Sequence, residues 1–413
     1  MDKARKRIFM INQTDESHRF GVGRYISEMV SEAQKRKNAL EMVVVTIGAP
    51  GVQAPIMKAE GNMQYLDIPK PFVAREQTIK GLSRQFSLAV FCIMADLFDF
   101  SENDIFHFNN NMQYFLLKEI KENTSAKIIY TIHVSLWKVF YKNDKNKFLS
   151  LWKEPDETST NILNIRAEKK NCMLADSVIC LTNSMAQDVK DFYEVTNHKI
   201  KVVPNGIDAG KAQDDQKGIS VLAQKMATQT NEFVFLFVGR LNDQKGVKEL
   251  VEAFISVSLS VDVPLTLIVV GEGYLHKTLD DMAKKSGASI FFTGYVEPGE
   301  IHKYYGMANG IVFPSSNEQS SYVMLEAMKY KVPLIVTNIP AFEVLRHGSS
   351  CLKTELVDEK VNMDSLVKNM SRLALDPSLV ERVAQNAFEL FKENYSSENM
   401  FIGTYGDLFT KEQ

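Results

Sequence analysis

Two series of short apolar runs, each run separated from the next by a helical stretch, constrain the fold of this chain most strongly. The runs are β-rich and almost continuous, as expected for parallel strands that are buried on both faces. Their alternation with helices predicts an α/β fold. The first series occupies residues 7–11, 42–47, 105–108, 127–132, 177–181 and 201–204, and the second occupies 233–238, 265–270, 290–292, 310–313 and 333–336.

A mostly polar stretch separates the two series. It begins at the turn signal Asn205-Gly206 and runs to Thr230. A length of 413 residues accommodates two or three domains with separate cores. We therefore expect Rossmann-like domains at 1–205 and 206–395, with parallel sheets facing a central cleft, and a helix at 396–413 that packs back on the first domain. Such sheets bind ligands at the carboxyl ends of their strands.

Charge and cysteine content exclude several classes of protein. A net charge of −3 gives no support to a nucleic-acid binder. The four cysteines show neither a CxxC motif nor a metal-binding spacing, which is typical of buried thiols in a reducing compartment. The apolar segment after the basic N-terminus is too short for a signal peptide, and no run is long enough to span a bilayer. We expect a cytoplasmic protein.

Contact with the inner face of a membrane stays open at this point. Residues 84–94 form a partly amphipathic helix, and Lys35-Arg36-Lys37 is a basic cluster in the same half. A core helix and a solvated charge run are the favoured interpretations of the two features.

The segment 313–328 holds the most suggestive pair of carboxylates. Glu318 follows a predicted strand that ends at Pro314, and Glu326 lies eight residues later on a predicted helix. The start of that helix leaves backbone N–H groups free for a phosphate. Most such Glu pairs are solvated helix faces, but carboxylates beside a phosphate site suggest nucleotide-sugar chemistry.

Two cations follow a strand in the second half. Arg240 and Lys245 lie in the loop between the strand end at Gly239 and a helix that starts near Val247. Arginine offers a planar fork for phosphate and lysine a point charge. A solvated loop is the usual place for either residue alone, whereas both at one strand end favour a phosphate site. The strand-end turns 271–273 and 294–296 are interpreted as ordinary turn chemistry.

The first half offers weaker signals. Gly21 and Gly23 follow the first strand in a GxG spacing typical of phosphate loops and, about as often, of tight turns. His133 follows a strand and could act as a hydrogen-bond partner or general acid/base, although a lone histidine there is more often structural. His107, inside a strand, is interpreted as core or cleft lining. No metal-binding spacing is evident.

Taken together, these motifs resemble the glycosyltransferase family 4 proteins, which are retaining glycosyltransferases of GT-B fold. The resemblance covers nearly the whole chain and is densest from residue 233 to 344. The matching pieces occur in the family's order: GVGRY (21–25), FHFNN (106–110), TIH (131–133), PNGID (204–208), FVGRLNDQKG (237–246), VVGEG (269–273), FTGYV (292–296) and FPSSNEQSSYVMLEAM (313–328).

The resemblance implies a hexosyl transfer from a nucleotide diphosphate-sugar, expected to be a UDP-sugar, to a glycan, lipid-linked saccharide or small molecule. It also implies that neither a metal nor a cofactor is needed. The roles that it implies are as follows: Arg240 and Lys245 at the diphosphate, Gly21 and Gly23 at its phosphate end, Glu326 at the ribose, Glu318 at the transferred sugar, His133 beside that sugar, Tyr295 near the base, and Ser321, Tyr322 and Val323 at the helix start.

Two positions depart from the family pattern. The family commonly has Pro-Phe-Gly-Leu after the first Glu, where this chain has Gln-Ser-Ser-Tyr at 319–322. Serine adds a Cβ and a hydroxyl that can bind an oxyanion or cap the helix, so we expect activity to survive but carry over no donor preference. Val134 stands where an acidic residue is common, which leaves His133 less clearly polarised.

Rival functions remain at this point. An epimerase would convert the sugar nucleotide without an acceptor, a phosphorylase would need inorganic phosphate, and a non-catalytic partner would bind the donor without turnover. A nicotinamide oxidoreductase is disfavoured because the first glycine loop lacks GxGxxG. The acceptor is not readable, since the aromatic-rich residues 137–157 could stack on sugars, dock a protein or form a lid.

Overall fold

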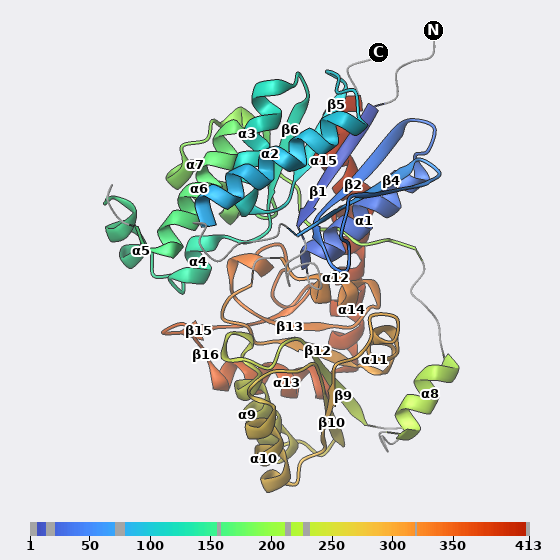
Figure 1. Cartoon of the computed structure of the whole chain (residues 1–413). Coiled ribbons are helices and arrows are strands. Elements are labelled where there is room, and N and C mark those ends of the chain that lie inside the picture. Colours follow the sequence, from blue (N-terminus) through green and yellow to red (C-terminus); the bar gives the residue numbers. More distant parts are fainter. Residues whose placement is uncertain are drawn as a thin grey trace. The chain divides into compact units, whose positions relative to one another are not determined.

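The computed structural model describes residues 6–13, 21–70, 79–154, 158–210, 216–225, 232–318 and 320–409. The chain divides into two compact units, one comprising Met1–Asn205 with Ser397–Gln413 and the other Gly206–Ser396. Each unit is built on its own predominantly parallel sheet flanked by helices (Figure 1). The predicted α/β class with two Rossmann-like sheets is therefore confirmed.

The sheet of the first unit has the strand order β3-β4-β2-β1-β5-β6-β7-β8. Its pairs are parallel except β3 with β4. The strands are β1 (Lys6–Gln13), β2 (Leu40–Ala49), β3 (Ile56–Glu60), β4 (Met63–Pro69), β5 (Asp104–Phe108), β6 (Lys127–Ile132), β7 (Ser177–Cys180) and β8 (Ile200–Val202). Each strand predicted in this half is present, and the β3–β4 hairpin is an addition. Every residue of β3 is exposed, so the sequence contains no buried apolar run that would predict this strand.

Helices cover this sheet and complete its core. They are α1 (Gly21–Lys35), α2 (Ile79–Leu97), α3 (Tyr114–Asn123), α4 (Leu136–Phe140), α5 (Lys145–Trp152), α6 (Thr160–Leu174), α7 (Asn183–Tyr193) and α15 (Ser397–Phe409). Val90 and Met94 of α2 are buried in the core cluster, so the stretch 84–94 is a core helix on that face. Along the described part of the chain, no helix combines the length and apolar content that a bilayer span requires.

The sheet of the second unit is entirely parallel and has the order β11-β10-β9-β12-β13-β14. Its strands are β9 (Phe233–Val238), β10 (Leu265–Val270), β11 (Ile290–Gly294), β12 (Gly310–Phe313), β13 (Leu334–Thr337) and β14 (Leu352–Thr354), and β15 (Leu356–Val357) and β16 (Lys360–Val361) form a separate ribbon. The chain winds outward from β9 in one direction and from β12 in the other. The carboxyl ends of β9 and β12 therefore mark the topological switch point, where doubly wound sheets bind ligands.

Helices flank the second sheet on both faces, and successive strand residues point to opposite cores. Leu236 and Ile268 belong to one cluster, whereas Phe235 and Leu267 belong to the other. This alternation buries both faces, as a parallel sheet requires. The helices are α8 (Gln216–Lys225), α9 (Val247–Ser258), α10 (His276–Ser286), α11 (Ile301–Met307), α12 (Tyr322–Lys329), α13 (Met363–Leu375) and α14 (Pro377–Asn394).

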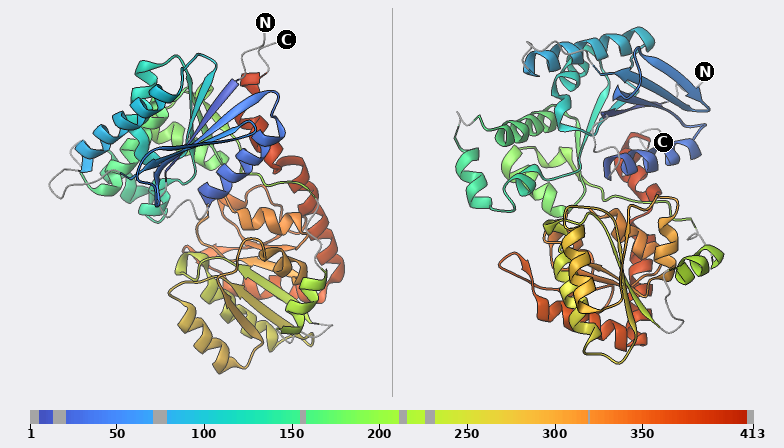
Figure 2. Two further views of the ribbon diagram at one scale, coloured as in Figure 1. Left: turned by 45° about the vertical axis from the view of Figure 1, so that its right-hand side comes forward. Right: turned by 60° about the horizontal axis from the view of Figure 1, so that its bottom comes forward.

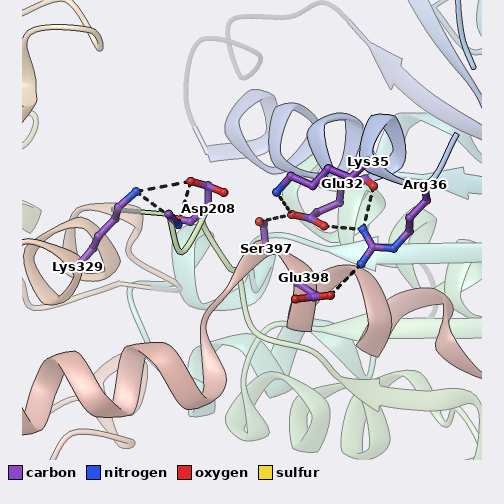
Figure 3. Close-up of polar contacts among 8 residues, drawn as sticks. Glu32, Lys35, Arg36, Asp208, Lys329, Ser397 and Glu398 are labelled. Atoms are coloured by element: carbon purple, nitrogen blue, oxygen red, sulfur yellow. Dashed lines mark hydrogen bonds and ion pairs between the residues drawn. The ribbon is translucent and has the colours of Figure 1, made fainter. Parts of the chain in front are cut away.

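The C-terminal helix α15, red in Figure 2, lies along α1, blue in the same views. A buried carboxylate, Glu32, joins the two helices (Figure 3). It accepts hydrogen bonds from Lys35 (2.7 Å), Arg36 (2.5 Å) and Ser397 (2.8 Å), while Arg36 also contacts Glu398 at 3.4 Å. Burial acts to raise the pKa of Glu32, but these hydrogen bonds outweigh burial and lower it. Two of the three basic residues interpreted as a solvated run are thus partners of a buried carboxylate.

Candidate functional site

Two loops meet at the switch point of the second unit. One follows β9 and contains Lys245, the last residue of a short 3-10 helix, η4 (Asp243–Lys245). The other follows β12 and contains Glu318. The loops are hydrogen-bonded directly, because the backbone N–H of Ser316 donates to the carbonyl of Gln244 at 3.1 Å. The fold therefore brings together the cationic and acidic residues that the sequence placed at separate strand ends.

Glycine at position 246 makes this close approach possible. Gly246 has φ +62°, and a Cβ there would overlap the carbonyl oxygen of Pro314. The side chain of Asn242 caps the short helix by accepting from the backbone N–H of Lys245 at 3.2 Å. The backbone on both sides of Lys245 is thereby fixed, so the loop presents the lysine in a defined position.

Lys245 and Glu318 form an ion pair across the two loops. The same carboxylate oxygen of Glu318 accepts from the hydroxyl of Ser315 at 3.2 Å. The hydroxyl of Thr337 on β13 in turn donates to the carbonyl of Ser315 at 2.5 Å, which anchors this loop to the sheet. Both members of the pair remain partly exposed, at 22% for Lys245 and 13% for Glu318, so a ligand can reach them.

Glu326 lies on α12, in the helix that follows the acidic loop. The hydroxyl of Tyr305 donates to its Oε2 at 2.8 Å. Tyr305 is 1% exposed and stacks on Tyr330 with ring centroids 5.4 Å apart, so its hydroxyl is held in place. Nothing in the local sequence indicated Tyr305 as a partner of Glu326, because the two residues lie on different helices.

A serine side chain caps the first turn of α12. Ser321 is its N-cap, and the hydroxyl accepts from the N–H of Met324 at 3.2 Å. Of the two roles considered for this serine hydroxyl, oxyanion binding and helix capping, the structure shows the capping contact. Its φ of −93° lies in ordinary extended space, so the Cβ is accommodated without strain. Tyr322 and Val323 follow in the first turn and are half-buried.

Backbone contacts tie the neighbouring strand ends to the cationic loop. The N–H of Leu241 donates to the carbonyl of Glu272 at 2.8 Å. A Cβ at Gly271 or Gly273 would overlap the carbonyl oxygens of Gly239 and Leu241, respectively. The glycines of the turn 271–273 are therefore needed for close packing of these loops. Two predicted site residues on this edge, Arg240 and Tyr295, are exposed, the latter at 62%.

His133 lies at the carboxyl end of β6 in the first unit. Its Nε2 lies 3.0 Å from Oδ1 of Asn109, which can only accept, so Nε2 carries the proton and Nδ1 is the acceptor. Its ring packs edge-on against Tyr25 at 4.8 Å, and burial lowers its pKa to about 3. A neutral histidine with a fixed tautomer results. Asn109 lies in the quoted FHFNN stretch, but its role depends on the pairing of β5 with β6.

Two expectations for the first unit concern segments that extend partly beyond the described residues. Gly21 and Gly23 lie in the first turn of α1, so they are not loop glycines, and residues 14–20 before them fall outside the described ranges. In the stretch 137–157, Trp137, Tyr141 and Phe148 are buried in the core. Of the same stretch, residues 155–157 are likewise not described.

His107 is fully buried, as its interpretation as a core residue requires. The described side chains include no group of three or more His, Cys, Asp or Glu residues placed to hold a metal ion.

Comparisons with solved structures identify the fold. The Anabaena protein Alr3699/HepE, solved in complex with UDP and glucose, matches with a TM-score of 0.71 and 16% identity over 98% of this chain and all of that chain. Sucrose-phosphate synthase of Thermosynechococcus elongatus matches with a TM-score of 0.72 and 17% identity over 98% of both chains. At this level of identity the likeness shows the GT-B fold.

Sequence relatives point in the same direction. An uncharacterized glycosyltransferase of Methanocaldococcus jannaschii, MJ1607, is 24% identical over 302 residues, or 72% of this chain and 73% of the relative. The alpha-monoglucosyldiacylglycerol synthase of Streptococcus pneumoniae is 28% identical over 234 residues, or 53% and 52%. The match with the latter thus spans about half of that relative.

Two family descriptions together account for most of the chain. Residues 21–211 match "Glycosyltransferase Family 4", and residues 220–390 match "Glycosyl transferases group 1". The first match covers the unit that holds His133, and the second covers the loops that hold Lys245 and Glu318. The chain belongs to glycosyltransferase family 4, the group 1 glycosyl transferases of GT-B fold.

Proposed function

We propose that this protein is a retaining, metal-independent glycosyltransferase that transfers a hexose from a UDP-sugar to a hydroxyl of a glycan, a lipid-linked saccharide or a small molecule. The observation that carries the proposal is the Lys245–Glu318 contact at the switch point of the second sheet. A partly exposed cation, two carboxylates and a capped helix start on adjacent loops suit a nucleotide diphosphate-sugar.

The second unit supplies the donor-binding groups in this proposal. Lys245 and Arg240 neutralise the charge that develops on the leaving diphosphate. Glu326, oriented by Tyr305, accepts hydrogen bonds from the ribose hydroxyls. The N–H groups at the start of α12 contribute further donors to the phosphates. When a phosphate oxygen replaces Glu318 as the partner of Lys245, the carboxylate of Glu318 contacts the transferred sugar.

The first unit supplies His133 as a neutral hydrogen-bond partner of the sugar. Because its pKa is about 3, the imidazole is uncharged at neutral pH, and Nδ1 accepts from a sugar hydroxyl. Gly21 and Gly23, in the first turn of α1, leave room for the phosphates near that helix start. Tyr295, exposed in the turn 294–296, lies near the base of the nucleotide.

The reaction proceeds with retention by attack on the face that the diphosphate leaves. The bond between the anomeric carbon and the phosphate oxygen breaks, and the bond to the acceptor oxygen forms on the same face. The proton of the acceptor hydroxyl passes to the departing phosphate oxygen, so no protein base is consumed. Cationic side chains and helix N–H groups do the work that a metal does in other phosphate-transfer sites.

A thermal-shift screen over UDP-, GDP- and ADP-sugars tests the donor assignment. We expect stabilisation by one UDP-sugar in the presence of EDTA, and loss of that shift in Glu326→Gln. NMR of the product anomeric proton, with an acceptor panel, then tests retention. Conversion of the donor without acceptor would indicate an epimerase, a strict need for inorganic phosphate a phosphorylase, and binding without turnover a non-catalytic partner.

A further inference from the structure

A buried chain of polar side chains runs from the C-terminal helix α15 toward His133. The hydroxyl of Tyr405 lies 2.6 Å from Nδ1 of His107, and Nε2 of His107 lies 2.7 Å from Oγ1 of Thr131. The exposed fractions of Tyr405, His107 and Thr131 are 0%, 0% and 1%. Thr131 precedes His133 by two residues at the end of β6. All of these groups belong to the first unit.

Aromatic contacts extend this chain to the ring of His133. Tyr25 stands edge-on to His107 at 5.9 Å and to His133 at 4.8 Å, so one tyrosine ring separates the two histidines. Asn109 provides a second link, because its amide nitrogen donates to the backbone carbonyl of His107 at 3.4 Å while its oxygen accepts from His133. His133 therefore contacts two neighbours, Tyr25 and Asn109, that also contact His107.

Hydrogen bonds at both ring nitrogens fix His107 in one orientation. Burial lowers its pKa to about 3, so the ring is neutral and one nitrogen donates while the other accepts. An apolar side chain of similar size could fill the space of His107 without needing two buried hydrogen-bond partners, so packing alone does not require a histidine there. A fully satisfied buried network is instead a means of specifying one arrangement of the surrounding side chains.

We propose that Tyr405 and His107 are positioning residues for His133, so that the seating of α15 determines whether His133 is correctly placed. The inference rests on the proposed function, in which Nδ1 of His133 faces the transferred sugar. Loss of the Tyr405 hydroxyl frees one nitrogen of His107 and loosens the packing of Tyr25. Ser397, the first residue of α15, is also the point at which the chain returns from the second unit.

The kinetic test compares Tyr405→Phe with Tyr193→Phe. Both substitutions remove a buried, hydrogen-bonded tyrosine hydroxyl in the same unit, but Tyr193 donates to Glu168 at 2.5 Å, whereas the ring nitrogens of His107 bond Tyr405 and Thr131. We expect Tyr405→Phe to lower kcat about 10-fold with the donor KM unchanged, and Tyr193→Phe to keep the wild-type kcat. A wild-type kcat in Tyr405→Phe, or an equal fall in both variants, overturns the proposal.

Histidine side-chain NMR gives a readout that does not need activity. In protein labelled with ¹⁵N-histidine, we expect the tautomer signals of His133 to change in Tyr405→Phe and to stay unchanged in Tyr193→Phe. Absence of glycosyl transfer by the wild-type protein would refute the proposed function, whereas unchanged His133 signals in Tyr405→Phe would refute the positioning role alone. If Tyr405→Phe does not fold, Thr131→Val removes the other partner of His107, and unchanged His133 signals there count equally against the proposal.

Discussion

Lys245 and Glu318 form an ion pair that joins the loop after β9 to the loop after β12. In the proposed function these residues serve different parts of the donor, the lysine its diphosphate and the glutamate its sugar. The carboxylate of Glu318 occupies the place on Lys245 that a phosphate oxygen would take in that proposal. In the proposed function, donor binding is therefore an exchange of one oxyanion for another at Lys245.

Glu318→Gln tests this exchange, because the substitution removes the anionic competitor and keeps the shape of the side chain. We expect UDP, which lacks the sugar, to bind about 5-fold more tightly, since breaking a partly exposed pair costs about 1 kcal/mol. Turnover of the UDP-sugar should fall at the same time. Isothermal titration calorimetry measures the first effect, with Glu252→Gln on α9 as the matched control. Unchanged or weaker UDP binding in Glu318→Gln would contradict the exchange.

Lys245→Ala should remove stabilisation of the leaving diphosphate. We expect kcat to fall about 10²-fold with donor saturating, equivalent to roughly 3 kcal/mol of transition-state stabilisation. Lys248→Ala is the control, because Lys248 lies three residues later, is 51% exposed and only reaches Glu252 at 3.9 Å. Steady-state kinetics of both variants decide the matter, and a wild-type turnover rate in Lys245→Ala would show that the lysine assignment is wrong.

The positions of Lys245 and Glu318 could be predicted because parallel strands end at one edge of a sheet. Their direct pairing could not, since it depends on the loop geometry that Gly246 and Asn242 impose. Likewise, Tyr305 reaches Glu326 from another helix, and no short-range pattern in the sequence marks such a contact.

Two features of the first half could not be resolved from the sequence for equally physical reasons. Aromatic residues in the stretch 137–157 were compatible with sugar stacking, but Trp137 and Phe148 stack on each other in the core, with ring centroids 5.4 Å apart. Composition does not reveal which face of a short helix is buried. Lys35 is exposed, as a solvated run predicts, but the pairing of Lys35 and Arg36 with buried Glu32 could not be predicted, because no short-range pattern shows that α15 packs on α1 there.

Gly246→Ala should be far more destabilising than Gly287→Ala. Both glycines have positive φ, +62° and +69°, but only at position 246 would a Cβ overlap another group, the carbonyl of Pro314. Backbone strain alone costs about 1 kcal/mol, so we expect that loss for Gly287→Ala and more than about 2 kcal/mol for Gly246→Ala. Urea unfolding measures both. Equal losses would mean that the two loops can separate freely at Pro314.

Glu168 on α6 is a buried carboxylate for which the proposed reaction has no use. It is 4% exposed, and its Oε1 accepts from the hydroxyl of Tyr193 on α7 at 2.5 Å. Burial raises its pKa from 4.5 to about 8, although the hydrogen bond from Tyr193 opposes this shift. At neutral pH the folded protein therefore holds Glu168 mostly in its protonated form.

The free energy of unfolding should consequently fall as pH rises from about 4.5 to about 8, because the folded state binds a proton that the unfolded chain releases. Protonated Glu168 contributes its full share to the free energy of unfolding below pH 4.5, and this share is lost by about pH 8. Each unit of difference between the folded and unfolded pKa is worth about 1.4 kcal/mol. Glu168→Gln keeps a neutral polar side chain that does not titrate. The free energy of unfolding of this variant, relative to that of the wild type, should therefore rise from pH 4.5 to pH 8. Urea unfolding at pH 5, 6.5 and 8 measures the difference. A constant difference between the two proteins across these pH values would show that Glu168 is ionised in the fold, because only a raised pKa makes the gap grow with pH.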